Sequence, residues 1–254
     1  MTSNRQHLIG IKQAIRYEWM EKTANLLLAG LGQKAIRHEL HEYLASKKGD
    51  GSEGPRSVQT RTFVVNNLMN IWISPEQSLM SFRDIAADFL QNYPRESLIG
   101  HWSMVSAAYP FWFNVARHTG RLLALQDQVT QSQITSRLKE QYGDRETIAR
   151  YARFVIRSFV AWGVLRDADS KGCYRRELAT RKTTVSSVTL LFESALHVLP
   201  SENSSLTSLT NNPAFFPFNI PVLTAAEIVQ LSDRIDIQRS GISDELLSLH
   251  NGQR

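Results

Sequence analysis

The sequence has a single cysteine, Cys173, among its 254 residues. One thiol cannot form an internal disulfide, and the N-terminus has an amphipathic pattern in place of the apolar core of a signal peptide. We therefore expect a cytoplasmic protein in which Cys173 is a small, half-buried strand residue. Long apolar runs are also missing. Stretches such as 26–29 and 188–192 are far shorter than the roughly 20 residues of a membrane-spanning helix, so no membrane association is expected.

The motifs that mark many enzymes are absent as well. There is no G-x-S-x-G elbow, no Walker loop and no nuclease-like pair of carboxylates with a following lysine. Residues 30–35 match a G-x-G-x-x-A dinucleotide fingerprint, but the residues before them are helical in pattern, which favours a turn between helices. His38 and His41 lie one helical turn apart without a further ligand nearby, which favours a solvated face. We expect no enzymatic activity, no cofactor and no metal.

Positive charge is present in excess, and it is concentrated in one segment. The chain has 29 Lys and Arg against 24 acids, a net charge of +5. Residues 128–182 contain twelve of these cations and six of the acids, so their balance is 12 − 6 = +6 and the remainder sums to −1. A local basic patch predicts a polyanionic partner, because it attracts phosphates at long range and releases counterions on contact. An anionic membrane surface is the weaker alternative.

The pattern of this basic segment predicts two helices joined by a tight turn. Gly143 is expected to make the turn and Asp144 to cap the second helix. At about 100° per residue, Arg150, Arg153 and Arg157 fall on the outward side of that helix, together with Glu146. The opposite, apolar side comprises Ile148, Tyr151, Ala152, Val155, Ile156, Phe159 and Trp162.

A β-hairpin is predicted to follow the second helix. Its strands are expected at 164–166 and 173–176, with a turn at 167–172. Lys171 lies near the tip, and Arg175 and Arg176 follow it. These three cations are expected to hold a flanking phosphate or the minor groove of DNA. Asp167 and Asp169 fit such a role least well, and we expect them to form the turn through hydrogen bonds to the backbone.

The segment QSQITSRLKEQYGDRETIARYARFVIRSFVAWGVL, with the hairpin after it, resembles the winged helix-turn-helix superfamily. We therefore predict that Arg150, Arg153 and Arg157 enter the major groove and that Gln133 and Arg145 fix the two helices on phosphates. The whole layout is similar to small accessory proteins of BREX-type phage-defence loci in bacteria. That second resemblance implies an antiviral defence context.

Overall, the sequence predicts a mainly helical fold in three parts. These are a helical N-terminal domain (1–125), a winged helix-turn-helix with a small β-hairpin wing (126–182), and a C-terminal segment of helical and extended chain (183–254). Helices are expected at 5–46 with a break at 30–32, at 58–73, at 74–92 with Ser74 as the cap, at 97–125 with a break at Pro110, at 184–199 and at 224–232. Loops are expected at 47–57 and 201–212, extended chain over the core at 213–223, a strand at 234–238 and a last helical turn at 243–250.

Two functions from different classes compete. The first is a non-enzymatic protein that binds double-stranded DNA, either a transcriptional regulator or a DNA-recruiting accessory subunit of a bacterial defence or DNA-processing complex. Other subunits of such a complex are then further partners, and a homodimer is compatible because paired wings read two half-sites. The alternative is a protein-interaction scaffold without direct DNA contact. Its working surface would be the aromatic N-terminal helices and the segment from Phe215 to Phe218.

Overall fold

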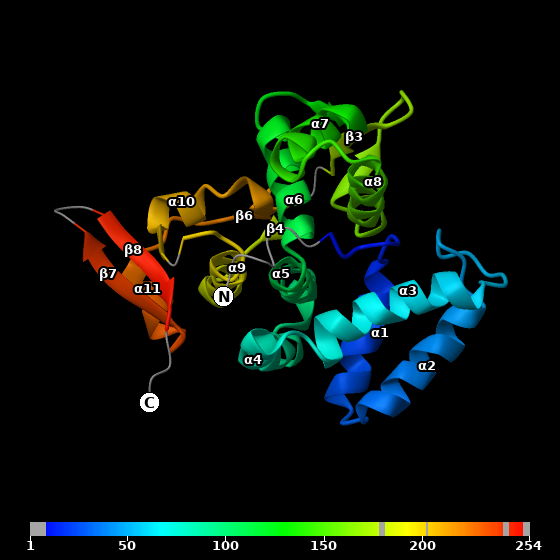
Figure 1. Cartoon of the computed structure of the whole chain (residues 1–254). Coiled ribbons are helices and arrows are strands. Elements are labelled where there is room, and N and C mark those ends of the chain that lie inside the picture. The colour runs from blue at the N-terminus through cyan, green and yellow to red at the C-terminus, as the bar shows by residue number, and fades with distance from the viewer. Residues whose placement is uncertain (1–8, 178–180, 202, 241–243, 251–254) are drawn as a thin grey trace.

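The part of the chain that the structure describes is mainly helical and includes three small sheets (Figure 1). The computed structural model describes residues 9–177, 181–201, 203–240 and 244–250. Within them the α-helices are α1 (Tyr17–Leu28), α2 (Gln33–Ala45), α3 (Val58–Leu68), α4 (Met80–Asn92), α5 (Ser97–Ala108), α6 (Pro110–Leu123), α7 (Gln131–Tyr142), α8 (Glu146–Ala161), α9 (Val185–Leu196), α10 (Leu206–Thr210) and α11 (Ala225–Gln230). The strands are β1 (Gln128–Thr130), β2 (Leu165–Asp167), β3 (Cys173–Arg176), β4 (Arg181–Lys182), β5 (Asn203–Ser205), β6 (Phe218–Asn219), β7 (Ile235–Ser240) and β8 (Asp244–Leu249).

Helices α5 and α9 pack against each other in the interior. Every residue from Leu98 to Ala107 and from Ser187 to Leu196 is buried, which explains why both helices are apolar on all sides. Helix α6 packs on α5 and begins at Pro110, so the predicted break there is confirmed. Gly120 of α6 lies directly under the Pro213 carbonyl, where any side chain would collide with it.

Helices α1, α2 and α3 form one end of the molecule, α8 lies above them in the view, and α7 packs on α6 and α8 (Figure 1). The predicted break at 30–32 and the loop at 47–57 are confirmed, and Gly30 has a φ of 76°. The prediction of a helix from residue 5 is wrong for residues 9–16, which are not helical, while 5–8 lie outside the described residues. Ile11 and Ile15 are fully buried although this segment is not helical. Their four-residue spacing matches a helical pattern, but contacts with other parts of the chain bury them.

The helix predicted at 58–73 is confirmed as α3 and a continuing π-helical turn, Met69–Ile73. The start predicted at Ser74 is wrong, although the end at Asn92 is confirmed. A 3₁₀ turn, Gln77–Leu79, precedes α4, and neither start is capped by a side chain. The Ser74 amide instead donates to the Met69 carbonyl, so Ser74 closes the preceding turn.

The hairpin predicted after α8 is confirmed as β2 and β3. The sequence interpretation did not include β1, which pairs with β3 on its other edge and gives an antiparallel sheet of order β1-β3-β2. A three-residue strand such as Gln128–Thr130 leaves almost no periodic signal, and only its partner defines it.

Two predictions in the C-terminal part are wrong. The loop predicted at 201–212 contains β5 and α10, and the helical turn predicted at 243–250 is strand β8, apart from residues outside the described part. Strand β8 lies between β5 and β7 in an antiparallel sheet and buries Leu247. Pairing on both sides decided its conformation. The predicted strand at 234–238 and helix at 224–232 are confirmed as β7 and α11, and the helix predicted at 184–199 as α9.

The segment from 213 to 223 lies over the core, as expected, with a 3₁₀ turn (Pro213–Phe215) and strand β6, which pairs in parallel with β4. Phe215, Phe216 and Phe218 are 2%, 7% and 7% exposed. They cannot form the surface that the scaffold hypothesis assigned to them, because core helices cover their rings.

Among the described residues, no helix has both the length and the apolar character needed to cross a bilayer.

Candidate nucleic-acid interface

Helix α7 begins with a complete capping box, which involves one of the predicted site residues. The Gln133 amide donates to Thr130 Oγ1 at 3.1 Å, and the Thr130 amide donates to Gln133 Oε1 at 2.8 Å. The Gln131 amide donates to the Gly172 carbonyl at 2.8 Å, which ties the start of α7 to the hairpin tip. Gln133 therefore lies where predicted, at the first turn of α7, and its side-chain oxygen already stabilises that turn.

The turn between α7 and α8 is made by Gly143, with a φ of 85°, as predicted. The prediction that Asp144 caps α8 is wrong. The N-cap position is Arg145 and has no side-chain cap, while the Asp144 carboxylate pairs with Lys139 Nζ at 2.6 Å. The ion pair with Lys139 holds the Asp144 carboxylate away from the backbone amides at the start of α8. Arg145 is exposed and donates from Nη2 to the Tyr142 carbonyl at 2.9 Å.

Helix α8 presents the predicted outward row of arginines, but its three members are not equivalent. Arg150 and Arg153 are exposed, and each guanidinium lies over the ring of the next residue, Tyr151 or Phe154, at 5.4 and 5.9 Å. No carboxylate of the described residues lies within ion-pair distance of either group. Arg157 differs, because its Nη1 donates to Asp167 Oδ1 at 2.6 Å.

The Arg157–Asp167 pair joins α8 to the hairpin. The hydrogen bond that Arg157 donates to the Asp167 carboxylate raises the pKa of Arg157 above its usual value. Asp167 was expected to form the turn through backbone bonds; instead it pairs with this cation. An exposed pair of this kind contributes only about 0.2–1 kcal/mol, so a phosphate can displace Asp167 at small cost.

The hairpin places the remaining predicted cations near its tip and along β3. Lys171 is exposed at the turn. Arg175 lies 3.7 Å from Asp169, a distance that leaves this pair weak, and the Arg176 guanidinium lies 5.9 Å from the centre of the Phe216 ring. Cys173 is half-buried in β3, as expected.

A polar groove of about 600 Å³ lies between α7, the start of α8 and the hairpin tip. One face of α7 contributes Ser132, Thr135, Ser136 and Lys139, and the tip contributes Lys171. Within the described part of the chain, the Thr135 hydroxyl has no hydrogen-bond partner. The sequence interpretation missed this face, although spacings of three, four and seven residues are a readable signal of one helical side.

Hydroxyls and ammonium groups on two facing walls suit a phosphodiester strand, because they offer donors and positive charge together. In contrast, the described residues include no group of three or more His, Cys, Asp or Glu placed to hold a metal ion. His101 is buried in the core, with 1% of its surface exposed, and His118 Nε2 lies 3.3 Å from Gln141 Oε1.

The groove lies next to Arg150, because Ala149 of α8 is part of its lining, and the hairpin tip contributes Lys171 to it. Thr130, Gly143 and Gly172 set its backbone geometry, and the apolar side of α8 anchors it to the core. Comparison with known proteins adds no further constraint: no protein-family model, no curated protein and no solved structure matches this chain.

Proposed function

We propose that this protein binds double-stranded DNA through a winged helix-turn-helix formed by residues 126–182, with α8 as the recognition helix. The observation that carries the proposal is the pair of exposed guanidinium groups, Arg150 and Arg153, beside the groove that contains Lys139 and Lys171. Two such groups without carboxylate partners are ready to bind phosphates or guanine edges.

The order of elements supports the proposal. Helix α6, β1, α7, α8, β2 and β3 follow one another along the chain, and β1 pairs with β3 beside the hairpin. In winged helices of this order the second helix of the pair lies in the major groove and the hairpin contacts the flanking backbone. Arg145 and Arg150 then lie at the groove-reading end of α8, and Gln133 lies at the phosphate-facing start of α7.

The proposed role is non-enzymatic. The protein regulates transcription or recruits DNA to other subunits of a bacterial defence complex, as its resemblance to accessory proteins of BREX-type loci implies.

The double variant Arg150→Ala/Arg153→Ala tests the proposal. Fluorescence anisotropy with a labelled duplex at low salt should show a more than about tenfold loss of affinity, since each arginine contact contributes roughly 1–3 kcal/mol. The matched control is Lys34→Ala/Arg37→Ala on α2, which removes the same charge from another surface. Equal affinity of a folded α8 variant and the wild type contradicts the proposal.

The scaffold alternative predicts a different result in the same samples. An oligomer whose size does not change when duplex is added supports it, whereas a species that shifts with duplex supports DNA binding. The burial of Phe215, Phe216 and Phe218 removes one of the two surfaces that this alternative named.

A further inference from the structure

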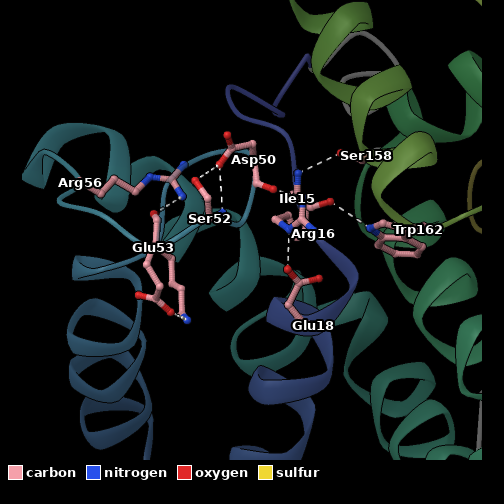
Figure 2. Close-up of polar contacts among 10 residues, drawn as sticks. Ile15, Arg16, Glu18, Asp50, Ser52, Glu53, Arg56, Ser158 and Trp162 are labelled. Atoms are coloured by element: carbon pink, nitrogen blue, oxygen red, sulfur yellow. Dashed lines mark hydrogen bonds and ion pairs between the residues drawn. The ribbon is translucent and has the colours of Figure 1, made fainter. Parts of the chain in front are cut away.

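The chain before α1 runs against the C-terminal end of α8 and is fixed there. The Ile15 amide donates to Ser158 Oγ at 2.8 Å, and the Trp162 indole donates from Nε1 to the Ile15 carbonyl at 2.9 Å (Figure 2). Ile15 is fully buried. These residues are more than 140 positions apart in sequence, so the two bonds set where the N-terminal helices lie relative to the proposed recognition helix.

The loop between α2 and α3 is fixed to the same segment. Arg16 donates from Nη1 to the Asp50 carbonyl at 2.6 Å and also pairs with Glu18 (Figure 2). Gly51 has a φ of 86° and packs so closely on the Arg16 guanidinium that a side chain there would collide with it. The Asp50 carboxylate accepts from the amide and hydroxyl of Ser52 at 3.0 and 2.7 Å, which closes the turn. These contacts hold the tip of the loop beside α8.

A cleft of about 400 Å³ separates this loop and the N-terminal segment from α8. Arg153 and Arg157 line one wall and Arg16 lines the other. Asp50 is the one acidic residue among the residues that line the cleft, and its carboxylate is bonded to Ser52. Glu18 pairs with Arg16 and Asp167 pairs with Arg157, so Arg153 is the guanidinium that lines the cleft without a carboxylate partner among the described residues.

We infer that this cleft holds the sugar-phosphate backbone of bound DNA, so that the α2–α3 loop is a second contact outside the winged helix. The inference rests on the proposed function. A recognition helix reads bases with its N-terminal residues, so the C-terminal half of α8 faces the backbone that borders the groove. The cleft lies along that half and shares Arg153 and Arg157 with the outward face of α8. It offers a phosphodiester the Arg153 guanidinium, together with the Arg157–Asp167 pair, which a phosphate can open at small cost.

Charge changes at Gly49 test the inference without disturbing the fold. Gly49 lines the cleft, has no positive φ, and a Cβ there would have no neighbour within 4 Å. Gly49→Glu should weaken duplex binding and Gly49→Lys should strengthen it, each by about two- to fivefold for an exposed charge interaction. The slope of log affinity against log salt should become shallower by about 0.9 with Gly49→Glu and steeper by a similar amount with Gly49→Lys. If the loop had only a structural role, the two substitutions would not change the affinity for duplex in opposite directions.

Gly32 provides the matched control, because it also has open space and no positive φ. It lies at the opposite end of α2, about 20 Å away along a 13-residue helix. Gly32→Glu and Gly32→Lys should leave affinity and salt slope almost unchanged. A photo-reactive phenylalanine analogue at position 49 should cross-link to the duplex, and the same analogue at position 32 should not.

The outcomes separate this inference from the proposed function. If Arg150→Ala/Arg153→Ala abolishes binding while both Gly49 variants bind as the wild type does, the loop contact is wrong and the winged-helix proposal stands. If the wild type shows no salt-dependent duplex binding, both are wrong. Cross-linking at position 49 to an acidic peptide but not to duplex would also overturn the inference, because the cleft would then serve a protein partner.

Discussion

At the scale of single residues, the cations of α8 differ in what holds them. Arg150 and Arg153 lie over neighbouring aromatic rings and have no carboxylate partner among the described residues, whereas Arg157 is bonded to Asp167. The helical periodicity of the sequence places all three on one side of α8, but it does not show which of them has a carboxylate partner. We therefore expect Arg150 and Arg153 to contribute more to DNA affinity than Arg157, whose guanidinium must first leave Asp167.

His101 is the residue whose ionisation is most constrained by the fold. Its ring is buried edge-on against Tyr17 and Trp72, with centroids 5.3 and 5.4 Å apart. Burial lowers the pKa of His101 from 6.5 to about 3. Between these values the unfolded chain binds a proton that the folded chain does not, so the free energy of unfolding falls as the pH falls.

We predict that His101→Phe reduces this acid sensitivity. From pH 7 to pH 5 the wild type should lose about 2 kcal/mol more stability than the variant, because one pH unit corresponds to about 1.4 kcal/mol per proton. The phenylalanine ring preserves the aromatic contacts. Urea unfolding at both pH values measures the difference, with His38→Gln on the exposed face of α2 as the control. Equal losses in wild type and His101→Phe would show that the buried imidazole does not contribute.

At the scale of secondary-structure elements, α8 is connected to the N-terminal segment by two buried hydrogen bonds that use the backbone of Ile15. Four other tryptophans are buried, and their indole N–H groups have no acceptor within the described part of the chain: Trp19, Trp72, Trp102 and Trp112. This contrast makes Trp162 distinctive, since its indole contributes a specific bond as well as apolar area.

Trp162→Phe should therefore destabilise the protein more than Trp112→Phe does. Both changes remove similar ring area, but only the first leaves the buried Ile15 carbonyl unpaired, which costs about 1–3 kcal/mol. Ser158→Ala should act similarly on the Ile15 amide, with Ser103→Ala as its control, because the Ser103 hydroxyl has no partner among the described residues. Denaturant unfolding measures all four variants, and equal costs within each pair would contradict the proposed role of these bonds.

At the scale of the whole molecule, the uneven charge should govern binding. Residues 128–182 have a balance of +6 and the remainder −1, so the molecule presents one basic region on a nearly neutral body. If the protein binds DNA as proposed, long-range attraction should orient the duplex toward α8 and the hairpin before contact.

A titration in a salt series on duplexes of unrelated sequence tests this arrangement. Five predicted site cations have no carboxylate partner among the described residues: Arg145, Arg150, Arg153, Lys171 and Arg176. If each neutralises one phosphate, the slope of log affinity against log salt should be about −4 to −5. A slope near zero would mean that the basic region does not bind phosphates. A difference in affinity between duplexes would measure base readout separately.

Much of the architecture follows from local sequence. Local sequence predicts the apolar faces of α7 and α8, the turn at Gly143 and the hairpin turn at 167–172. Each of these features depends on residues fewer than about ten positions apart. The candidate cations could also be identified from the sequence, because the residue type alone gives the charge. Strand β8 and residues 9–16 were not predictable, because their conformation depends on strands or helices far away in the chain.

The sequence by itself determined a mainly helical chain with a basic segment, two helices and a β-hairpin at 128–182, because periodicity, turn chemistry and charge are local properties. Tertiary structure alone decided that Asp167 of the hairpin pairs with Arg157 of α8 and that the α2–α3 loop faces the arginines of α8 across a cleft. Those arrangements depend on which distant groups meet when the core closes, and burial of the whole chain selects them together.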